Sequence, residues 1–277
     1  MKKPIGLITR GKTATNRLRR VDNFILMYEP ALLSSGKLGA DSLFVDLGYG
    51  FDPRTTLESA MRFRKLNPNL KILGVEIDKE RVAAAQPYAD DKTFFRLGGF
   101  NLPLKENETV RLIRAFNVLR QYEEKDFMPA YNKLMDYVLP NGLMIEGTSN
   151  PFGSIWVANV VRRLESNSLL FETHKQTSET QNWRFESLVF STNFRLGFEA
   201  QEFQTILPKN LIHQVVKGNI IYDFFQDWIQ ASKETSSTKT YGFKQWFIAA
   251  AEKLAHKGYK IDLHKKWLSK GWLIWYQ

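Results

Sequence analysis

The sequence predicts an α/β protein built on a doubly wound, mostly parallel sheet, with an N-terminal helix before the sheet and a C-terminal α/β appendage after it. Short apolar runs alternate with segments of helical periodicity between residues 41 and 150. The first of these runs ends in a glycine turn that leads directly into a helix. Beyond residue 200 the apolar positions follow helical spacing, in a region rich in tryptophan. These three observations predict the class.

The segment 43–53, LFVDLGYGFDP, is the centre of the predicted fold. It begins as a strand that is apolar apart from Asp46 and continues through Gly48 and Gly50. Glycine permits positive φ angles and close approach of a ligand to the backbone. A strand, a glycine turn and a helix start place a ligand at the carboxyl edge of a parallel sheet. An ordinary strand–helix turn has the same pattern, so both interpretations stay open at this point.

The other elements of the alternating region follow in order. A helix over 53–66 begins with Asp52 as N-cap and Pro53 at its first position, and it stops before Asn67 and Pro68. Asp78 suits the N-cap of a second helix. Further strands are predicted at 71–77, 94–97, 110–116 and 143–147, and further helices at 79–86 and 127–138.

Both flanks have structure of their own. An amphipathic helix is predicted at 16–33; residues 155–164 fit helix or strand, 173–182 a loop and 185–190 a strand. Helical stripes start at 220 and cover 243–256, with a linker-like segment at 232–239 and a hairpin-like end at 267–273. We expect three regions: a basic N-terminal cap (1–40), a ligand-binding core (41–200) and a helical, aromatic region packed on the core (201–277).

Composition excludes several kinds of site. The 277 residues include no cysteine, which excludes disulfides and thiolate metal sites, and the four histidines form no ligand cluster, so no metal site is predicted. The chain has no run of 18 apolar residues and no apolar signal segment at its start. We therefore expect a cytoplasmic protein that does not span a membrane.

Charge and aromatic content each allow two interpretations. The net charge is +10, and seven basic side chains stand among the first 20 residues. They form either a surface for nucleic acid or another anion, or a solvated basic face, which we favour. Five of the seven tryptophans lie at or beyond Trp228. Aromatic residues interleaved with lysine can stack on nucleobases, but we favour a buried core.

Taken in order, these segments resemble the class I S-adenosylmethionine-dependent methyltransferases, which have a Rossmann-like fold. VDLGYG at 45–50 is similar to the glycine motif of the family, GVEID at 74–78 to the acidic end of its second strand, and LPNGL at 139–143 to the turn before its fifth strand. The resemblance covers roughly residues 41–150. The chain also resembles a group of uncharacterised bacterial proteins assigned to that fold, through NRLRRVD at 16–22 and FNVLRQY at 116–122.

The resemblance implies S-adenosylmethionine as the cofactor and makes the core Rossmann-like; it does not name the methyl acceptor or the oligomeric state. The implied cofactor-binding residues are Asp46, Gly48, Gly50, Glu76, Phe100, Asn101 and Asn117. Glu76 would accept hydrogen bonds from the ribose hydroxyls, although it also fits the role of a neighbour of the helix cap. Asp46 would order the glycine loop, since a buried acid needs partners.

Two positions depart from the family pattern. Residues 98–101, Gly-Gly-Phe-Asn, stand where the family often has an acid for the adenine amino group. Either Asn101 or the backbone would take the place of that acid, with Phe100 against the adenine ring. Asp52, next to Pro53, stands at the third glycine position of the family's loop, which alters the geometry of that loop. The cofactor of this family has no pyrophosphate, so the third glycine of a dinucleotide-binding loop is not required.

Methyl transfer from a sulfonium depends on alignment, and it needs a base only when the acceptor must lose a proton. Tyr122, beyond the fourth strand, and Glu146, at the end of the fifth, are the candidate catalytic residues, and each also fits a structural role. Asn117 is not followed by the Pro-Pro-Tyr of amino-methylating nucleic-acid enzymes. Two other functions stay open: a non-catalytic nucleoside- or nucleic-acid-binding protein of the same fold, and a nicotinamide-dependent oxidoreductase, which the missing third glycine disfavours.

Overall fold

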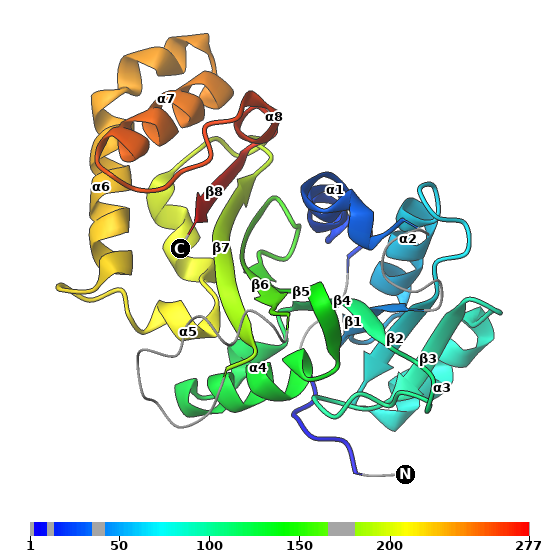
Figure 1. Cartoon of the computed structure of the whole chain (residues 1–277). Helices are drawn as coiled ribbons and strands as arrows, with labels where there is room; N and C mark the ends of the chain where they lie inside the picture. Colours follow the sequence, from blue (N-terminus) through cyan, green and yellow to red (C-terminus); the bar gives the residue numbers. More distant parts are fainter. Residues whose placement is uncertain (1–2, 10–13, 35–41, 166–180, 277) are drawn as a thin grey trace. The chain divides into compact units, whose positions relative to one another are not determined.

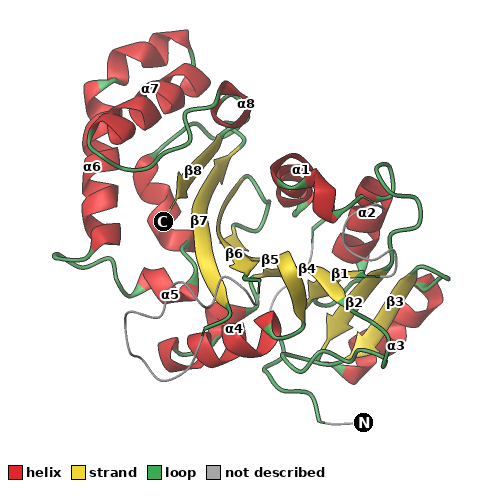
Figure 2. Cartoon of the chain, in the orientation of Figure 1, coloured by secondary structure: helices red, strands yellow, loops and turns green. Residues whose placement is uncertain are grey.

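The structure is a computed structural model of the 277-residue chain (Figure 1), and it describes residues 3–9, 14–34, 42–165 and 181–276. In these residues, helices flank one eight-stranded sheet with the strand order β3-β2-β1-β4-β5-β6-β7-β8 (Figure 2). The predicted α/β class with a doubly wound, mostly parallel sheet is confirmed.

The alternating region contains the elements that the sequence predicts, with small shifts at their ends. The strands are β1 (Leu43–Leu47), β2 (Ile72–Glu76), β3 (Thr93–Leu97), β4 (Val110–Phe116) and β5 (Val138–Ser149). The helices are α1 (Arg19–Tyr28), α2 (Arg54–Phe63), α3 (Lys79–Ala85) and α4 (Phe127–Met135).

The second half of the chain adds three strands, β6 (Ile155–Arg163), β7 (Trp183–Thr192) and β8 (Trp272–Tyr276). Its helices are α5 (Lys209–Ile212), α6 (Ile220–Glu234), α7 (Phe243–His256) and α8 (Lys265–Leu268), with 3-10 helices at Ala200–Ile206 and Ser236–Tyr241. The segment that fitted helix or strand is strand β6.

By packing, the chain forms two compact units. Unit 1 comprises Met1–Glu146 and Val161–Arg184, and unit 2 comprises Gly147–Val160 and Phe185–Gln277. The division into the regions 1–40, 41–200 and 201–277 stays a prediction.

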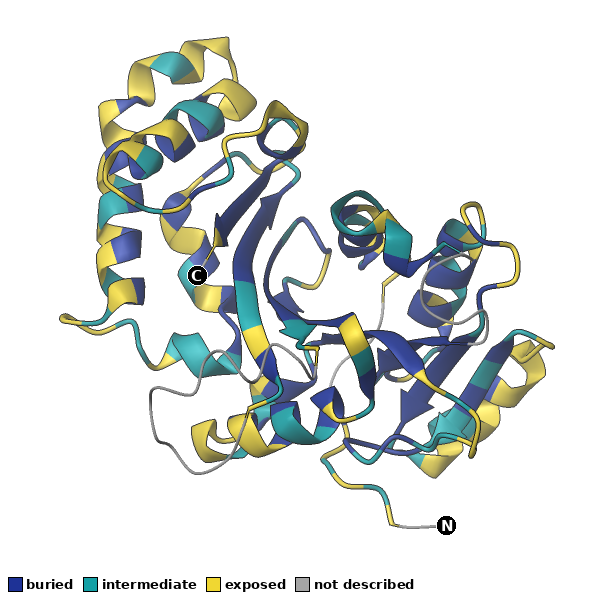
Figure 3. Ribbon diagram, viewed as in Figure 1, coloured by how far each residue is buried: buried dark blue, intermediate teal, exposed yellow. Residues whose placement is uncertain are grey.

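Parallel pairing in unit 1 brings the strand ends to one edge. β1 pairs in parallel with β2 and β4, and β2 pairs in parallel with β3. In this register Asp46 lies opposite both Gly74 and Arg114. The loops that follow these strands therefore start at the same edge, as in other open parallel sheets that bind ligands. Figure 1 shows α1 and α2 on one side of these strands and α4 on the other. Figure 3 shows β1, β2 and β4 as buried.

Helix starts follow local chemistry. Asp78 caps α3 as predicted, because its carboxylate accepts the N–H groups of Glu80 and Arg81 at 2.9 and 3.2 Å. The start of α2 differs by one position: Pro53 is the N-cap, and the Asp52 carboxylate accepts the N–H of Arg54 at 2.8 Å. Proline has no N–H to offer, so the cap bond reaches the next residue.

Three predictions about the flanks are wrong: the length of the helix at 16–33, the linker at 232–239 and the hairpin at 267–273. The helix expected at 16–33 is shorter, because α1 ends at Tyr28 and a 3-10 turn, Pro30–Leu32, follows. The linker-like segment 232–239 belongs to α6 and a 3-10 helix, because the Ser232 carbonyl accepts the Trp246 indole N–H at 2.6 Å. The loop expected at 173–182 lies outside the described residues except for its last two positions.

The terminal hairpin is the third wrong prediction. Trp267 and Leu268 lie in the short helix α8, and β8 pairs antiparallel with β7 rather than with a strand next to it in sequence. Both side chains are buried, so long-range packing decides the local structure.

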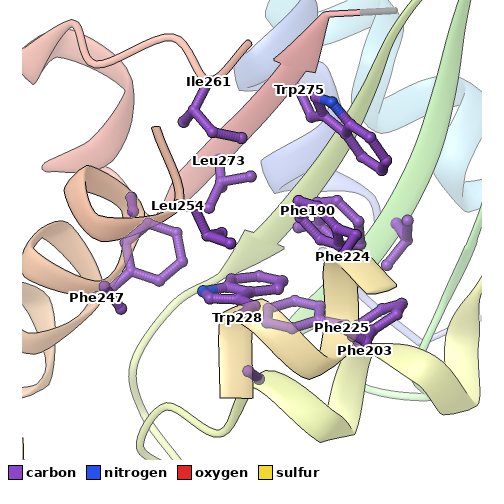
Figure 4. Packing of buried hydrophobic residues seen from close by; sticks show 14 of the residues in the cluster. Phe190, Phe203, Phe224, Phe225, Trp228, Phe247, Leu254, Ile261, Leu273 and Trp275 are labelled. Carbon is purple, nitrogen blue, oxygen red and sulfur yellow. The ribbon is translucent and has the colours of Figure 1, made fainter. Parts of the chain in front are cut away.

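The aromatic residues of unit 2 form a core, which confirms the interpretation favoured from the sequence. The five tryptophans of this region are buried: Trp228, Trp246, Trp267, Trp272 and Trp275. Figure 4 shows the cluster around α6, where the Phe224 ring stacks on Trp275 with ring centroids 4.3 Å apart. These rings are therefore packed against each other and not presented to a nucleic acid.

Candidate functional site

Hydrogen bonds connect the glycine turn after β1 to the end of β2. Gly48 and Gly50 have φ angles of 68° and 86°, which side-chain-bearing residues adopt only with strain. The Gly48 N–H donates to the Val75 carbonyl at 2.7 Å, and the Gly50 N–H donates to Glu76 Oε2 at 2.9 Å. A Cβ on Gly48 would lie 2.7 Å from a methyl of Val118, so the turn has no room for a side chain.

Glu76 is a buried carboxylate, 1% exposed, at the end of β2. Its Oε1 accepts the N–H of Ile77 at 2.9 Å, and Arg81 Nη1 lies 3.8 Å from its Oε2. Burial raises the pKa of Glu76, while the backbone bonds from Gly50 and Ile77 and the charge of Arg81 oppose that rise. The carboxylate therefore stands at the base of the glycine turn with several donors directed at it.

Asp46 orders the start of α2. Its Oδ2 accepts the hydroxyls of Thr55 and Thr56 at 3.2 and 2.7 Å and lies 2.8 Å from Arg114 Nη2. Thr55 and Thr56 open the helix that follows the glycine turn. Asp46 thus connects β1, β4 and α2 directly below the turn.

A second buried acid completes this network, and the sequence reasoning missed it. Asp22 of α1 contacts Arg114 and lies 2.9 Å from Arg62 Nη1, and the Ser59 hydroxyl donates to it at 3.0 Å. The side chains of Asp22 and Arg114 have no exposed surface. Burial alone would lower the pKa of Arg114, but Asp46 and Asp22 raise it. The sequence signal for this network was Arg114, a charged residue within the predicted strand 110–116. Its position opposite Asp46 comes from the structure.

Asn117 follows β4 directly and has a φ of 60°. Together with Asp46, Gly48 and Gly50 it lines a hollow at the carboxyl edge of β1 and β4. Arg17 lies at the same hollow, and burial, then Arg120, lowers its pKa. Four predicted cofactor residues therefore line one hollow.

A second hollow lies over the ends of β2 and β3. Glu76, Phe100 and Tyr122 line it from the core. Its other wall is the N-terminal segment, residues 3–9, which we call the strap; Thr9 lines both hollows. The strap crosses the edge of the sheet where the resemblance places the adenosine.

Backbone hydrogen bonds attach the first half of the strap to the loop after β3. The Phe100 N–H donates to the Ile5 carbonyl at 2.8 Å. The Asn101 side chain makes two bonds: its Oδ1 accepts the Ile5 N–H at 2.6 Å, and its Nδ2 donates to the Lys3 carbonyl at 2.9 Å. Phe100 and Asn101, which the resemblance assigns to adenine, thus contact the strap.

The second half of the strap contacts the loop after β4 and helix α3. The Tyr122 hydroxyl accepts the Leu7 N–H, and Gln121 Nε2 donates to the Leu7 carbonyl at 3.1 Å. Arg81 Nη1 donates to the carbonyl and hydroxyl oxygens of Thr9 at 3.0 and 3.2 Å.

The two candidate catalytic residues lie in different environments. Tyr122 lines the second hollow, its ring lies 5.1 Å from that of Phe100, and burial raises the pKa of its hydroxyl. Glu146 is 1% exposed and accepts the Tyr131 hydroxyl at 2.8 Å. The lining of the two hollows includes Tyr122 but not Glu146.

The basic N-terminal region does not form one uniform exposed face in its described part. Lys3 and Arg19 are exposed, whereas Arg17 and Arg20 are partly buried. Burial, and then the charge of Arg19, lowers the pKa of Arg20 to about 10. The remaining basic residues of this region, Lys2, Arg10 and Lys12, lie outside the described ranges.

The described ranges lack two kinds of feature. No helix there is long and apolar enough to cross a membrane. In the same ranges, no group of three or more acidic or histidine side chains is placed to bind a metal ion.

Comparisons with known proteins give structural neighbours only. No protein-family model matches the chain, and a search of curated proteins finds no significant match. Among solved structures, the chain is similar to LepI in complex with SAM (16% identity, 43% of this chain and 29% of that one, TM-score 0.34). It is also similar to the plantazolicin methyltransferase BpumL (13%, 60% and 54%, 0.36) and to the N-methyltransferase NodS from Bradyrhizobium japonicum WM9 (16%, 48% and 69%, 0.33).

The aligned part spans less than two thirds of LepI and of BpumL. The strand order, the parallel pairing of β1 to β4 and the glycine turn at their carboxyl edge define the fold independently of these scores. The chain is an α/β protein with a doubly wound, mostly parallel sheet and a glycine turn at the carboxyl edge of its first strand.

Proposed function

We propose that the protein is an S-adenosylmethionine-dependent methyltransferase that binds its cofactor at the carboxyl edge of β1, β2 and β4. One observation carries this proposal: the glycine turn has two positive φ angles, and its Gly50 N–H donates a hydrogen bond to the buried carboxylate of Glu76. That arrangement offers close backbone approach beside a hydrogen-bond acceptor, which suits a ribose with two hydroxyl donors.

The residues at the edge fit this cofactor. Gly48 keeps the backbone of the turn free of a side chain, for which Val118 leaves no room, and Glu76 lines the second hollow next to Phe100. Asp46, Gly50 and Asn117 line the first hollow, where acidic and amide oxygens suit a charged amino group. The ribose and adenine are therefore assigned to the second hollow, and the amino-acid part to the first.

When bound, S-adenosylmethionine would supply a methyl group on a positively charged sulfur, which a nucleophile displaces in line. The residues of this chain would align the acceptor rather than activate it strongly. Burial raises the pKa of the Tyr122 hydroxyl, so this residue suits hydrogen bonding better than proton abstraction. Glu146 stays a proposal for the acceptor side, with Tyr131 donating to it.

Binding calorimetry with S-adenosylhomocysteine, S-adenosylmethionine and NAD tests the assignment. Gly48→Ala should weaken S-adenosylhomocysteine at least tenfold, because the new Cβ lies 2.7 Å from Val118 and the turn must shift. Gly258→Ala is the matched control, since Gly258 also has a positive φ of 98° but nothing lies within 4 Å of the added Cβ. Equal affinity in both variants, or preferential binding of NAD, would reject the proposal.

The strap supports a second candidate, a non-catalytic protein of the same fold that binds a nucleoside. Its contacts to Phe100, Asn101 and Tyr122 involve residues expected to face cofactor or acceptor. A labelled-methyl assay against RNA, protein and metabolite fractions separates the two candidates. Cofactor binding without transfer to any fraction would favour the second.

A further inference from the structure

We propose that the strap and the nucleoside of the cofactor compete for one place, so that the cofactor site opens only when residues 3–9 withdraw. The inference rests on the proposed function, because it takes the second hollow as the nucleoside position. It adds that the protein carries its own competitor for that position.

Close backbone contact supports the competition. The Ile5 carbonyl receives the Phe100 N–H, and it would lie 2.0 Å from a Cβ placed on Gly99. Gly6 also comes close to the core, because a Cβ placed on it would lie 2.8 Å from the Tyr122 hydroxyl oxygen. An aromatic ring needs about 3.5–4.0 Å to the atoms on each of its faces, the ordinary contact distance between carbon atoms. A base therefore does not fit between the strap and the sheet edge.

The strap also uses the polar groups that would recognise a nucleoside. The Asn101 amide accepts from Ile5 and donates to Lys3, which is the donor–acceptor pair that an amide presents to the edge of adenine. Arg81 binds Thr9 and lies 3.8 Å from Glu76, the residue proposed for the ribose. Each of these groups exchanges one partner for another when the strap leaves.

The contacts of the strap with the sheet edge favour its release, because few of its apolar side chains are buried. It presents its backbone to the sheet edge, while the side chains of Ile5, Leu7 and Ile8 are 46, 55 and 51% exposed. Little apolar surface is therefore buried by the contact, and segments held mainly by a few hydrogen bonds open at low free-energy cost. If the competent state is only a fraction of the population, the apparent dissociation constant of the cofactor is raised by the inverse of that fraction.

Two substitutions at one strap position test the competition in the full chain. Leu7→Pro removes the N–H that the Tyr122 hydroxyl accepts, whereas Leu7→Ala keeps it and changes only an exposed side chain. Leu7 is not among the proposed cofactor residues. We expect Leu7→Pro to bind S-adenosylhomocysteine up to about tenfold more tightly than the wild type, the effect of one lost hydrogen bond, and Leu7→Ala to bind like the wild type.

Hydrogen exchange gives an independent measurement. Saturating S-adenosylhomocysteine should speed the exchange of amides in residues 3–9 and slow that of Gly48 and Gly50. Slower exchange in residues 3–9 would mean that the strap closes over the cofactor, and it would overturn the competition. Equal affinity of Leu7→Pro and Leu7→Ala would overturn it as well, with the methyltransferase proposal intact. Failure of every variant to bind the ligand would instead reject the proposed function and this inference with it.

Discussion

Removal of Arg114 should destabilise unit 1 in a way that depends on pH. Arg114→Met deletes a guanidinium that lies 2.8 Å from Asp46 and also contacts Asp22, all with little or no exposed surface. Breaking a buried ion pair by removing one partner costs about 3–5 kcal/mol, because the other charge stays buried. Asp22 keeps Arg62 and Ser59, which favours the lower end of that range.

Thermal unfolding followed by circular dichroism measures the effect. For a folding unit of about 150–250 residues, each kcal/mol lowers the melting temperature by about 2–4 °C, so Arg114→Met should melt roughly 6–20 °C below the wild type. Arg111→Met is the matched control. Arg111 is also buried in β4, but it donates to the carbonyl oxygens of Leu32, Ser34 and Ser42, which are neutral.

The sign of the pH dependence follows from Asp22. Burial raises the pKa of Asp22, and Arg114 is the largest charge that opposes the rise. Without Arg114 the folded-state pKa rises further above the unfolded value, and a group with a raised pKa loses stability as pH increases through the folded pKa. The deficit of Arg114→Met should therefore be smaller at pH 5 than at pH 8, while that of Arg111→Met stays constant. A deficit for Arg114→Met that is the same at both values would refute the reasoning.

Three further predictions concern the site, the surface and the second core. Glu76→Ala should weaken S-adenosylhomocysteine by about 1–3 kcal/mol in calorimetry, because a charge-assisted hydrogen-bond partner is lost; unchanged affinity would move the ribose contact to Asp78. If the basic N-terminal region contacts phosphates, RNA binding measured by fluorescence anisotropy should fall steeply as the salt concentration rises. Binding that does not change with salt would support the interpretation of this region as a solvated basic face. Phe224→Ala should cost about 3–5 kcal/mol in urea unfolding, because its ring stacks on Trp275, whereas Tyr241→Ala, at an 80% exposed ring, should change stability by less than about 0.5 kcal/mol.

Local chemistry made the core of the fold predictable. The strand 43–47 and the helix 243–256 occur with the bounds that the sequence predicts. The strand is apolar apart from Asp46, the helix has apolar residues at helical spacing, and a glycine stands next to each. The cap at Asp78 needed only a carboxylate two and three residues before the N–H groups it accepts. Such features depend on neighbours in the chain, so a single sequence contains them.

Long-range contacts decided the rest. The hairpin predicted at 267–273 failed because β8 pairs with β7, about 85 residues earlier in the chain, and no local pattern records that partner. The linker predicted at 232–239 failed for the same reason, since the indole of Trp246 binds the Ser232 carbonyl. Polar composition resembled a loop, but hydrogen bonds to a neighbouring helix ordered it.

The candidate site shows the same division. The sequence by itself determined the glycine turn and Glu76, because the turn directly follows one apolar strand and the acid directly ends the next. Only the tertiary structure decided that Asp22 and Asp46 share Arg114, and that Leu7 and Tyr122 meet across 115 residues. A charged residue in a predicted buried strand indicates that it needs a partner, but only the tertiary structure determines which residue that is. The strap contacts the sheet edge through backbone groups, which do not differ between residue types and so leave no pattern in the sequence.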